Sequence, residues 1–262
     1  MGKLETKYIS LGDARIAYRE HGSGPILILL HGNSESKRAF SRYQKVHFNT
    51  FRTIAIDSRG HGETISNDTQ YSIGQYSQDV IDLCNAKGIN QAYVIGYSDG
   101  GNIALFLAKK RPDIFTKIVA ISPNYLVSGT TDGWLRFFRS IRKILRFLGR
   151  VGLPTRKAIM RFDLMLNDIG ITEKELGSIR TNLRILYAEK DMIKEEHIQK
   201  MGSLIPGAST KKIGHCNHMT IFYRKDAIQD MKQYLLGEEG SRLTNRWSCP
   251  LKCLLEVSLR YQ

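Results

Sequence analysis

The feature that most constrains the fold of this chain is a regular alternation of short apolar runs with helical patterns. Residues 26–30 (ILILL) form a solid apolar run, which is typical of a strand buried on both faces of a parallel sheet. Further strands are expected at 52–57, 92–97 and 117–122, with helical periodicity at 72–87 and 99–111. Strands that alternate with helices predict right-handed crossovers and a mostly parallel sheet.

The pattern also divides the chain. Two strands at 3–10 and 14–20 read as a hairpin, and strands at 184–188 and 209–213 alternate with helices at 194–204 and 226–236. The alternation stops at 123–182, where we expect only helices and loops. We therefore predict an α/β core at 1–122 and 183–236, an inserted helical cap at 123–182, and a C-terminal tail at 237–262. The tail has no clear period, and we expect it to be peripheral and without catalytic role.

Composition excludes several classes of protein. With 262 residues and 42% hydrophobic content, the chain can bury the core of one large domain without a disulfide or a metal. No apolar run approaches the roughly 18 residues of a membrane-spanning helix, and the first residues lack a secretory signal. The four cysteines, Cys84, Cys216, Cys249 and Cys253, form no CxxC pair and no zinc spacing. We expect free thiols and a cytoplasmic location.

The sharpest chemical signal is the motif Gly96-Tyr97-Ser98-Asp99-Gly100-Gly101, which follows one expected strand and opens the next helix. A G-x-S-x-G motif at such a junction is the nucleophile elbow, where small residues let the chain turn sharply and expose the serine. The N-terminus of the following helix lies beneath that serine, and its partial positive charge favours anions there.

Here the chain resembles the α/β-hydrolase superfamily, over about residues 4–236. His31-Gly32-Asn33 follows the ILILL strand, where the family has its oxyanion loop, and Asp57-Ser58-Arg59-Gly60-His61-Gly62 resembles its D-x-R-G-x-G turn. The insertion at 123–182 matches the position of the family's cap. The resemblance implies an α/β-hydrolase fold, with a mostly parallel central sheet, helices on both faces and a helical cap.

A serine hydroxyl needs a general base that is oriented by a carboxylate. The resemblance implies the order serine, acid, histidine, and Asp191 follows the strand at 184–188 at the family's acid position. Glu189 is the alternative acid. His218 stands at the family's spacing from both the last strand and the last helix, and His215 is the alternative base.

The resemblance implies a catalytic triad of Ser98, Asp191 and His218, and an oxyanion hole formed by the backbone N–H groups of Asn33 and Asp99. We expect Asp99, Tyr97, Trp134 and Phe138 to contact the substrate. No metal and no organic cofactor are required.

We expect a carboxylesterase that acts on a small-molecule ester. The serine argues against haloalkane dehalogenases and epoxide hydrolases, which need an aspartate at the elbow. C–C bond hydrolysis, thioester hydrolysis and aminoacyl-ester hydrolysis stay open on the same triad, as does a ligand-binding or membrane-binding protein with vestigial turnover. The G-Y-S-D-G-G form resembles biphenyl-hydrolase-like esterases. Its Asp99 either attracts a cationic α-amino acyl group or only complements the helix dipole.

Net charge is the one extreme property, because 39 Lys and Arg outnumber 25 Asp and Glu to give +14. Nine basic residues and no acidic one lie between Trp134 and Arg161. Within this stretch an apolar stripe (Leu135, Phe138, Ile141, Leu145, Leu148) opposes the basic residues, as in an amphipathic helix. Three interpretations stay open: the apolar side covers the active site and the basic side faces water, the basic side attracts anionic membrane lipid or an acidic substrate, or it binds nucleic acid. No recognised motif supports specific nucleic-acid binding.

Overall fold

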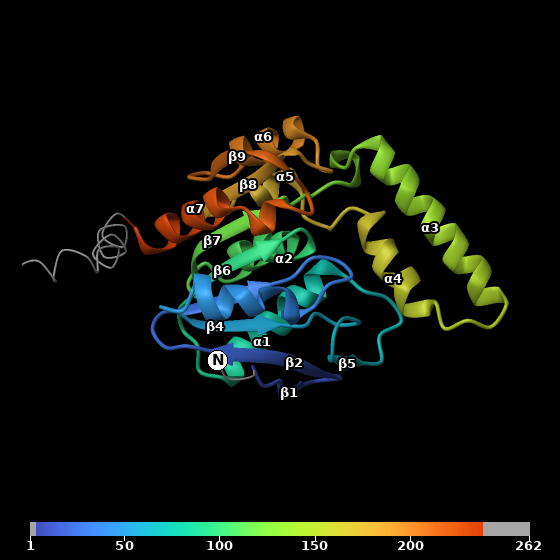
Figure 1. The fold of residues 1–262 in the computed structure, drawn as a ribbon, viewed down its shortest axis with the longest axis horizontal. Coiled ribbons are helices and arrows are strands. Elements are labelled where there is room, and N and C mark those ends of the chain that lie inside the picture. The colour runs from blue at the N-terminus through green and yellow to red at the C-terminus, as the bar shows by residue number, and fades with distance from the viewer. Residues whose placement is uncertain (1–3, 238–262) are drawn as a thin grey trace, which may run out of the picture.

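The computed structural model describes residues 4–237, which fold around one twisted sheet (Figure 1). The strands follow the order β1-β2-β4-β3-β6-β7-β8-β9, and the short β5 pairs with β2. The contacts of β2 with β1, β4 and β5 are antiparallel, and all other pairs are parallel. The bounds are β1 Lys7–Leu11, β2 Ala14–His21, β3 Ile26–Leu30, β4 Arg52–Ile56, β5 Ile65–Ser66, β6 Ala92–Tyr97, β7 Phe115–Ile121, β8 Asn182–Lys190 and β9 Ser209–Asn217.

The apolar character of β3 has a direct cause in the packing of both sheet faces. Successive side chains of a strand point to opposite faces. Ile28 and Leu30 belong to one hydrophobic cluster, with residues of α1 (Ile73–Ala86), α2 (Asp99–Lys110) and α6 (Glu195–Leu204). Leu27 and Leu29 belong to a second cluster on the other face, with α7 (Lys225–Leu236) and two short helical turns between β3 and β4. The predicted α/β fold with a mostly parallel sheet is confirmed.

Most elements begin and end close to the predicted residues, and the differences have identifiable reasons. The two-residue β5 is too short to produce a periodic signal. The turns Lys37–Phe40 and Tyr43–His47 were not predicted. The strands β8 and β9 run beyond their apolar stretches to Lys190 and Asn217, because these two residues still pair after an irregularity in the register.

The segment 123–182, which we call the inserted segment, lies between β7 and β8. It contains α3 (Asp132–Arg150), α4 (Arg156–Met165) and α5 (Glu173–Leu176). The helices α3 and α4 lie side by side beyond one end of the sheet, with α4 next to the core and α3 outermost (Figure 1). The long helix α3 therefore has one side against α4 and another turned away from the core.

Two further observations bear on the sequence predictions. None of the helices between residues 4 and 237 combines the length and apolar composition that crossing a bilayer requires. The predicted tail lies, except for Gly237, outside the described residues, and so do Cys249 and Cys253.

Candidate active site

Ser98 occupies a strained turn between β6 and α2. Its backbone has φ 54° and ψ −118°, a conformation that an L residue adopts only when its surroundings enforce it. Two glycines make the turn possible. A Cβ on Gly96 would come within 2.1 Å of the Gly100 carbonyl oxygen, and a Cβ on Gly100 within 2.0 Å of the Leu30 carbonyl oxygen. The side chain of Ser98 is left at the carboxyl edge of the sheet.

His218 and Asp191 lie at the same edge, because they follow β9 and β8, whose carboxyl ends meet there. His218 Nε2 is 3.1 Å from Ser98 Oγ, and His218 Nδ1 is 2.6 Å from Asp191 Oδ1. Both the imidazole and the carboxylate are almost fully buried. The three side chains form one continuous hydrogen-bonded chain that ends on the serine oxygen.

The alternative residues lie elsewhere. Glu189 and His215 are both exposed, and the His215 backbone N–H donates to Glu189 Oε2 at 2.6 Å. Neither residue contacts the hydrogen-bonded chain that reaches Ser98 in the part of the molecule that the structure describes. The structure thus brings together the first choices of the sequence analysis and leaves the two alternatives at the surface.

Besides His218, three further hydrogen-bond donors hold the carboxylate of Asp191. Its Oδ2 accepts from Ser122 Oγ at 2.5 Å and from the Ala188 backbone N–H at 2.9 Å, and its Oδ1 accepts from the Ile193 N–H at 3.2 Å. Burial by itself raises the pKa of Asp191, but His218, Ser122 and the backbone donors outweigh burial and hold this pKa below its ordinary value. The carboxylate is therefore ionised near neutral pH.

Ser122 was missed by the sequence analysis. It directly follows β7, whose last residue Ile121 pairs with Leu186 of β8. A polar residue at the carboxyl end of a neighbouring parallel strand was the only signal that could have indicated it.

Tyr97 has a different place from the one predicted. Its side chain is 4% exposed, and its hydroxyl donates to the His218 carbonyl oxygen at 2.9 Å. The ring packs against the rings of His218 and Phe222. Tyr97 thus holds the histidine loop in place.

Asn33 and Asp99 flank the serine as predicted, and their side chains contact each other. Asn33 Nδ2 donates both to Asp99 Oδ2 at 2.9 Å and to the carbonyl oxygen of Arg161 in α4 at 2.9 Å. Among residues 4–237, the backbone N–H of neither Asn33 nor Asp99 has a protein acceptor. Two such donors beside a nucleophile are the usual means of stabilising an oxyanion.

The site carries two further carboxylates in a chain whose net charge is +14. Burial raises the pKa of Asp99. The hydrogen bond from Asn33 and the nearby His218 lower this pKa, but they offset only part of the effect of burial. Glu35 accepts from the Gly32 backbone N–H at 3.2 Å, and burial raises its pKa too, against the opposing effects of Gly32 and His218. Glu35 was not predicted, because His-Gly-Asn-Ser-Glu reads like an ordinary loop.

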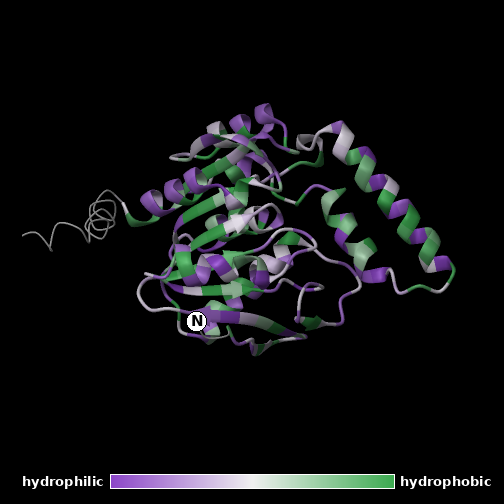
Figure 2. Cartoon of the chain, in the orientation of Figure 1, coloured by the Kyte–Doolittle hydropathy of each residue, from purple (hydrophilic) through white to green (hydrophobic). Residues whose placement is uncertain are grey.

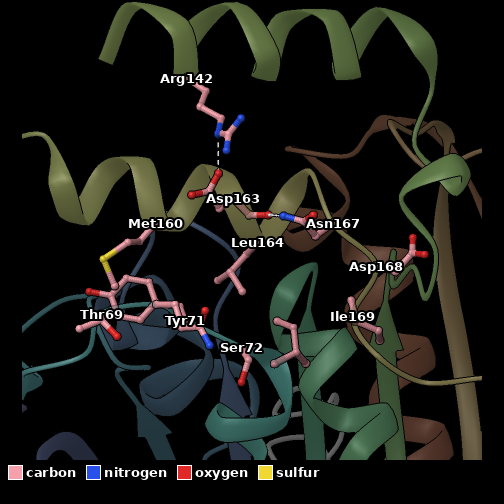
Figure 3. A pocket seen from close by; sticks show the side chains of 12 residues that line it. Thr69, Tyr71, Ser72, Arg142, Met160, Asp163, Leu164, Asn167, Asp168 and Ile169 are labelled. Carbon is pink, nitrogen blue, oxygen red and sulfur yellow. Dashed lines mark hydrogen bonds and ion pairs between the residues drawn. The ribbon is translucent and has the colours of Figure 1, made fainter. Parts of the chain in front are cut away.

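The inserted segment contacts this site through α4. Besides its carbonyl contact with Asn33, Arg161 donates from Nη1 to the Gly60 carbonyl oxygen at 3.1 Å. Beside this contact a cavity of about 330 Å³ lies between residues 69–73 and α4 (Figure 3). Figure 3 also shows Arg142 reaching from α3 to Asp163 of α4, with which it forms an ion pair. No triad residue lines this cavity.

Trp134 and Phe138 were predicted to contact the substrate, and the structure shows other partners for them. Their rings pack on each other, with centroids 5.6 Å apart, and Phe138 also packs on Phe162 of α4. Trp134 contacts Phe137 on α3 as well. These contacts lie within the inserted segment, where Phe138 of the apolar stripe of α3 faces α4.

Comparison with known proteins agrees with this geometry. Residues 25–150 match the family described as alpha/beta hydrolase fold, and solved α/β hydrolases superimpose on almost the whole described chain. The chain has the α/β-hydrolase fold.

Several proteins that are similar to this chain carry names. A 2-(acetamidomethylene)succinate hydrolase of Mesorhizobium japonicum is 30% identical over 116 residues, which are 44% of this chain and 42% of the relative. A solved structure of E-2-(acetamidomethylene)succinate hydrolase superimposes with a TM-score of 0.74 at 17% identity, covering 89% of this chain and 99% of that one. The enol-lactonase of Burkholderia xenovorans gives a TM-score of 0.71 at 18% identity, covering 88% of this chain and 100% of that one.

These likenesses have a clear extent. The chain spans less than half the length of the curated relatives that it matches. The solved structures are less than 25% identical to it, so they show the fold alone.

Proposed function

We propose that this chain hydrolyses carboxylic esters with Ser98 as nucleophile, His218 as general base and Asp191 as orienting acid. The observation that carries the proposal is the continuous contact from Asp191 through His218 to Ser98, at 2.6 and 3.1 Å. A serine with a base and an orienter within hydrogen-bonding reach is the arrangement that covalent acyl transfer requires.

The proposed reaction has two halves. Ser98 Oγ attacks the acyl carbonyl while His218 Nε2 takes its proton, and the carbonyl oxygen becomes an oxyanion between the N–H groups of Asn33 and Asp99. His218 then protonates the leaving alcohol, and the acyl group stays on Ser98. A water molecule, deprotonated by His218, attacks this acyl-enzyme and releases the acid. Loss of one oxyanion donor typically costs about 3–4 kcal/mol of barrier height.

The printed names of the relatives set the alternatives. An epoxide hydrolase, the name of one relative from Xenopus tropicalis, is disfavoured here because a serine stands at the elbow. A lactone is a cyclic ester, so the enol-lactonase name agrees with the proposed chemistry. C–C bond and thioester hydrolysis use the same triad, and the acyl group that fits the site decides among them.

One observation favours a narrower second candidate, the hydrolysis of aminoacyl esters. Asp99 directly follows Ser98, and Asn33 fixes its carboxylate, while Glu35 lies on the backbone of Gly32 in the predicted oxyanion loop. At about 5 Å and an effective dielectric constant of about 20, the attraction between one carboxylate and an ammonium group is about 3 kcal/mol. This energy corresponds to a gain in affinity on the order of 10²-fold. Glycine ethyl ester and its N-acetyl derivative differ in this charge and form a matched pair of substrates.

The primary test combines a fluorophosphonate probe with turnover of p-nitrophenyl acetate. The proposal expects labelling and turnover in the wild type, and loss of both in Ser98→Ala, with a fall in kcat on the order of 10⁶. Ser203→Ala, at an exposed position on α6, is the control and should keep both. Turnover that survives Ser98→Ala refutes the proposal, and labelling without turnover indicates a binding protein with vestigial activity.

The second candidate has its own test. Asp99→Asn keeps the backbone N–H and removes the charge. It should lower kcat/KM for glycine ethyl ester far more than for the N-acetyl derivative. An equal effect on both substrates would leave Asp99 with a structural role only.

A further inference from the structure

The helix α3 exposes apolar side chains that lie outside its predicted apolar stripe. Its buried residues are Leu135 and Phe138, and Phe138 packs on Phe162 of α4, but a second apolar row next to them is exposed. The side chains of this row are between 50% and 63% exposed: Phe137, Ile144, Phe147, Val151 and, in the turn that follows, Leu153. Singly exposed apolar residues are ordinary, whereas a contiguous row of them marks an interaction site.

A basic row runs along the same helix beside the exposed apolar row. Arg136, Arg139, Lys143, Arg146 and Arg150 recur every three or four residues and are all exposed, which places them on one side of a helix. In the part of the chain that the structure describes, none of the five forms an ion pair. Arg142 is different, because it is paired with Asp163 and ties α3 to α4. Figure 2 shows apolar and hydrophilic stretches alternating along α3, which lies outermost in the molecule.

The basic row continues into a groove at the end of α3. This open groove has a volume of about 690 Å³, and its lining includes Arg146, Arg150, Arg156 and Leu153, together with Asp163, which is paired with Arg142. Three guanidinium groups beside apolar side chains suit an anionic headgroup that carries acyl chains, since Arg recognises phosphate in a bidentate manner.

We propose that the outer face of α3 docks this protein on an anionic lipid bilayer. The docking face consists of the basic row Arg136, Arg139, Lys143, Arg146 and Arg150 and the apolar row Phe137, Ile144, Phe147, Val151 and Leu153. A helix of this kind lies in the bilayer interface, with apolar side chains among the acyl chains and basic side chains at the headgroups. This inference goes beyond the proposed hydrolysis and does not depend on it.

Charge decides between the bilayer and other occupants. A second copy of the chain, packed through the same face, would bring two basic rows close together, and their positive charges would repel each other. A nucleic acid offers phosphates but no apolar phase for the phenylalanines. An anionic bilayer complements both rows at once, and each basic residue near its surface is worth roughly fivefold in partitioning.

The test is co-sedimentation of the full-length chain with sucrose-loaded vesicles of phosphatidylcholine, with and without phosphatidylglycerol. All proteins carry Ser98→Ala, so turnover cannot alter the lipid and the outcome is independent of the proposed activity. The charge variant is R136Q/R139Q/K143Q/R146Q, which keeps Arg142 and its ion pair. The matched control is R42Q/K174Q/K190Q/K225Q, which removes four exposed positive charges elsewhere. Thermal unfolding verifies that each variant is folded.

We expect the unaltered docking face and the control to prefer anionic vesicles, and the charge variant to lose at least about tenfold in partitioning. The preference should weaken as the Debye length shrinks from about 10 Å at 0.1 M salt to about 3 Å at 1 M. A second variant, F137S/I144S/F147S, should lose the part of the binding that resists salt.

Equal binding to neutral and anionic vesicles, or equal losses in the charge variant and the control, overturns the proposal. Analytical ultracentrifugation supplies the other decisive outcome. If the chain is a dimer that F137S/I144S/F147S converts to a monomer, and if it does not bind vesicles, the face is an interface between copies of this chain and the proposal is wrong.

Discussion

Removal of the Ser122 hydroxyl should destabilise the protein in a pH-dependent way. Ser122 is buried, and its hydroxyl donates to Asp191 Oδ2 at 2.5 Å. A hydrogen bond to a charged group contributes about 1.5–3 kcal/mol to stability. Ser122→Ala removes this donor and leaves the Ala188 and Ile193 donors of the same carboxylate. We therefore expect the free energy of unfolding to fall by about 1.5–3 kcal/mol at pH 7.

The sign of the pH dependence follows from Asp191. Its pKa is lower in the folded protein than in the unfolded chain, where an aspartate titrates near about pH 4. Its ionised form therefore stabilises the fold above that pH, and this contribution is lost as the pH falls through the folded pKa. Because the Ser122 bond favours the ionised form, the difference between wild type and Ser122→Ala should be full above about pH 5 and should shrink in acid.

Urea unfolding followed by circular dichroism at several pH values measures this difference. Ser122 has φ 51°, so Ser122→Gly removes the same hydroxyl while relieving the backbone, and it should lose less stability than Ser122→Ala. An unchanged free energy of unfolding at pH 7, or a difference that grows in acid, would refute the reasoning.

Three further predictions concern the site, a turn and the tail. His218→Ala should lower kcat for p-nitrophenyl acetate on the order of 10⁶-fold, whereas His215→Ala, at the surface, should leave it nearly unchanged; steady-state assays decide. Gly62→Ala would place its Cβ 2.1 Å from a buried aspartate oxygen at φ +52°. It should therefore cost at least about 2 kcal/mol in thermal unfolding, more than Gly152→Ala, whose surroundings are open. Deletion of residues 238–262 should leave activity and solubility intact, as an assay of the truncated chain would reveal.

The sheet was predictable because the local sequence of each buried strand indicates its burial. A strand covered on both faces, such as β3, needs apolar residues at every position, so its sequence indicates both its structure and its surroundings. Ser98 was predictable for a similar reason, since only a tight turn between strand and helix requires glycines at both positions 96 and 100.

Other features depend on contacts between residues that are far apart in the sequence, and no local sequence pattern indicates such contacts. Ser122 meets Asp191 across 69 positions. Glu35 interacts electrostatically with His218 only because its loop folds close to that residue. The helical period of α3 indicates an amphipathic helix. It places Phe138, which is buried, in the apolar stripe and leaves out Phe137, which is exposed. It cannot tell that the ring of Phe138 packs on Phe162 of α4.

The amide of Asn33 has a consequence for how this protein can change over time. It joins the elbow, through Asp99, to the main-chain oxygen of residue 161. Every amino acid supplies that oxygen, so the hydrogen bond itself does not require an arginine at position 161. Substitutions at position 161 can therefore leave the link between α4 and the residues around Ser98 in place. This hydrogen bond to the backbone joins the inserted segment to the elbow whatever the side chain at position 161 is.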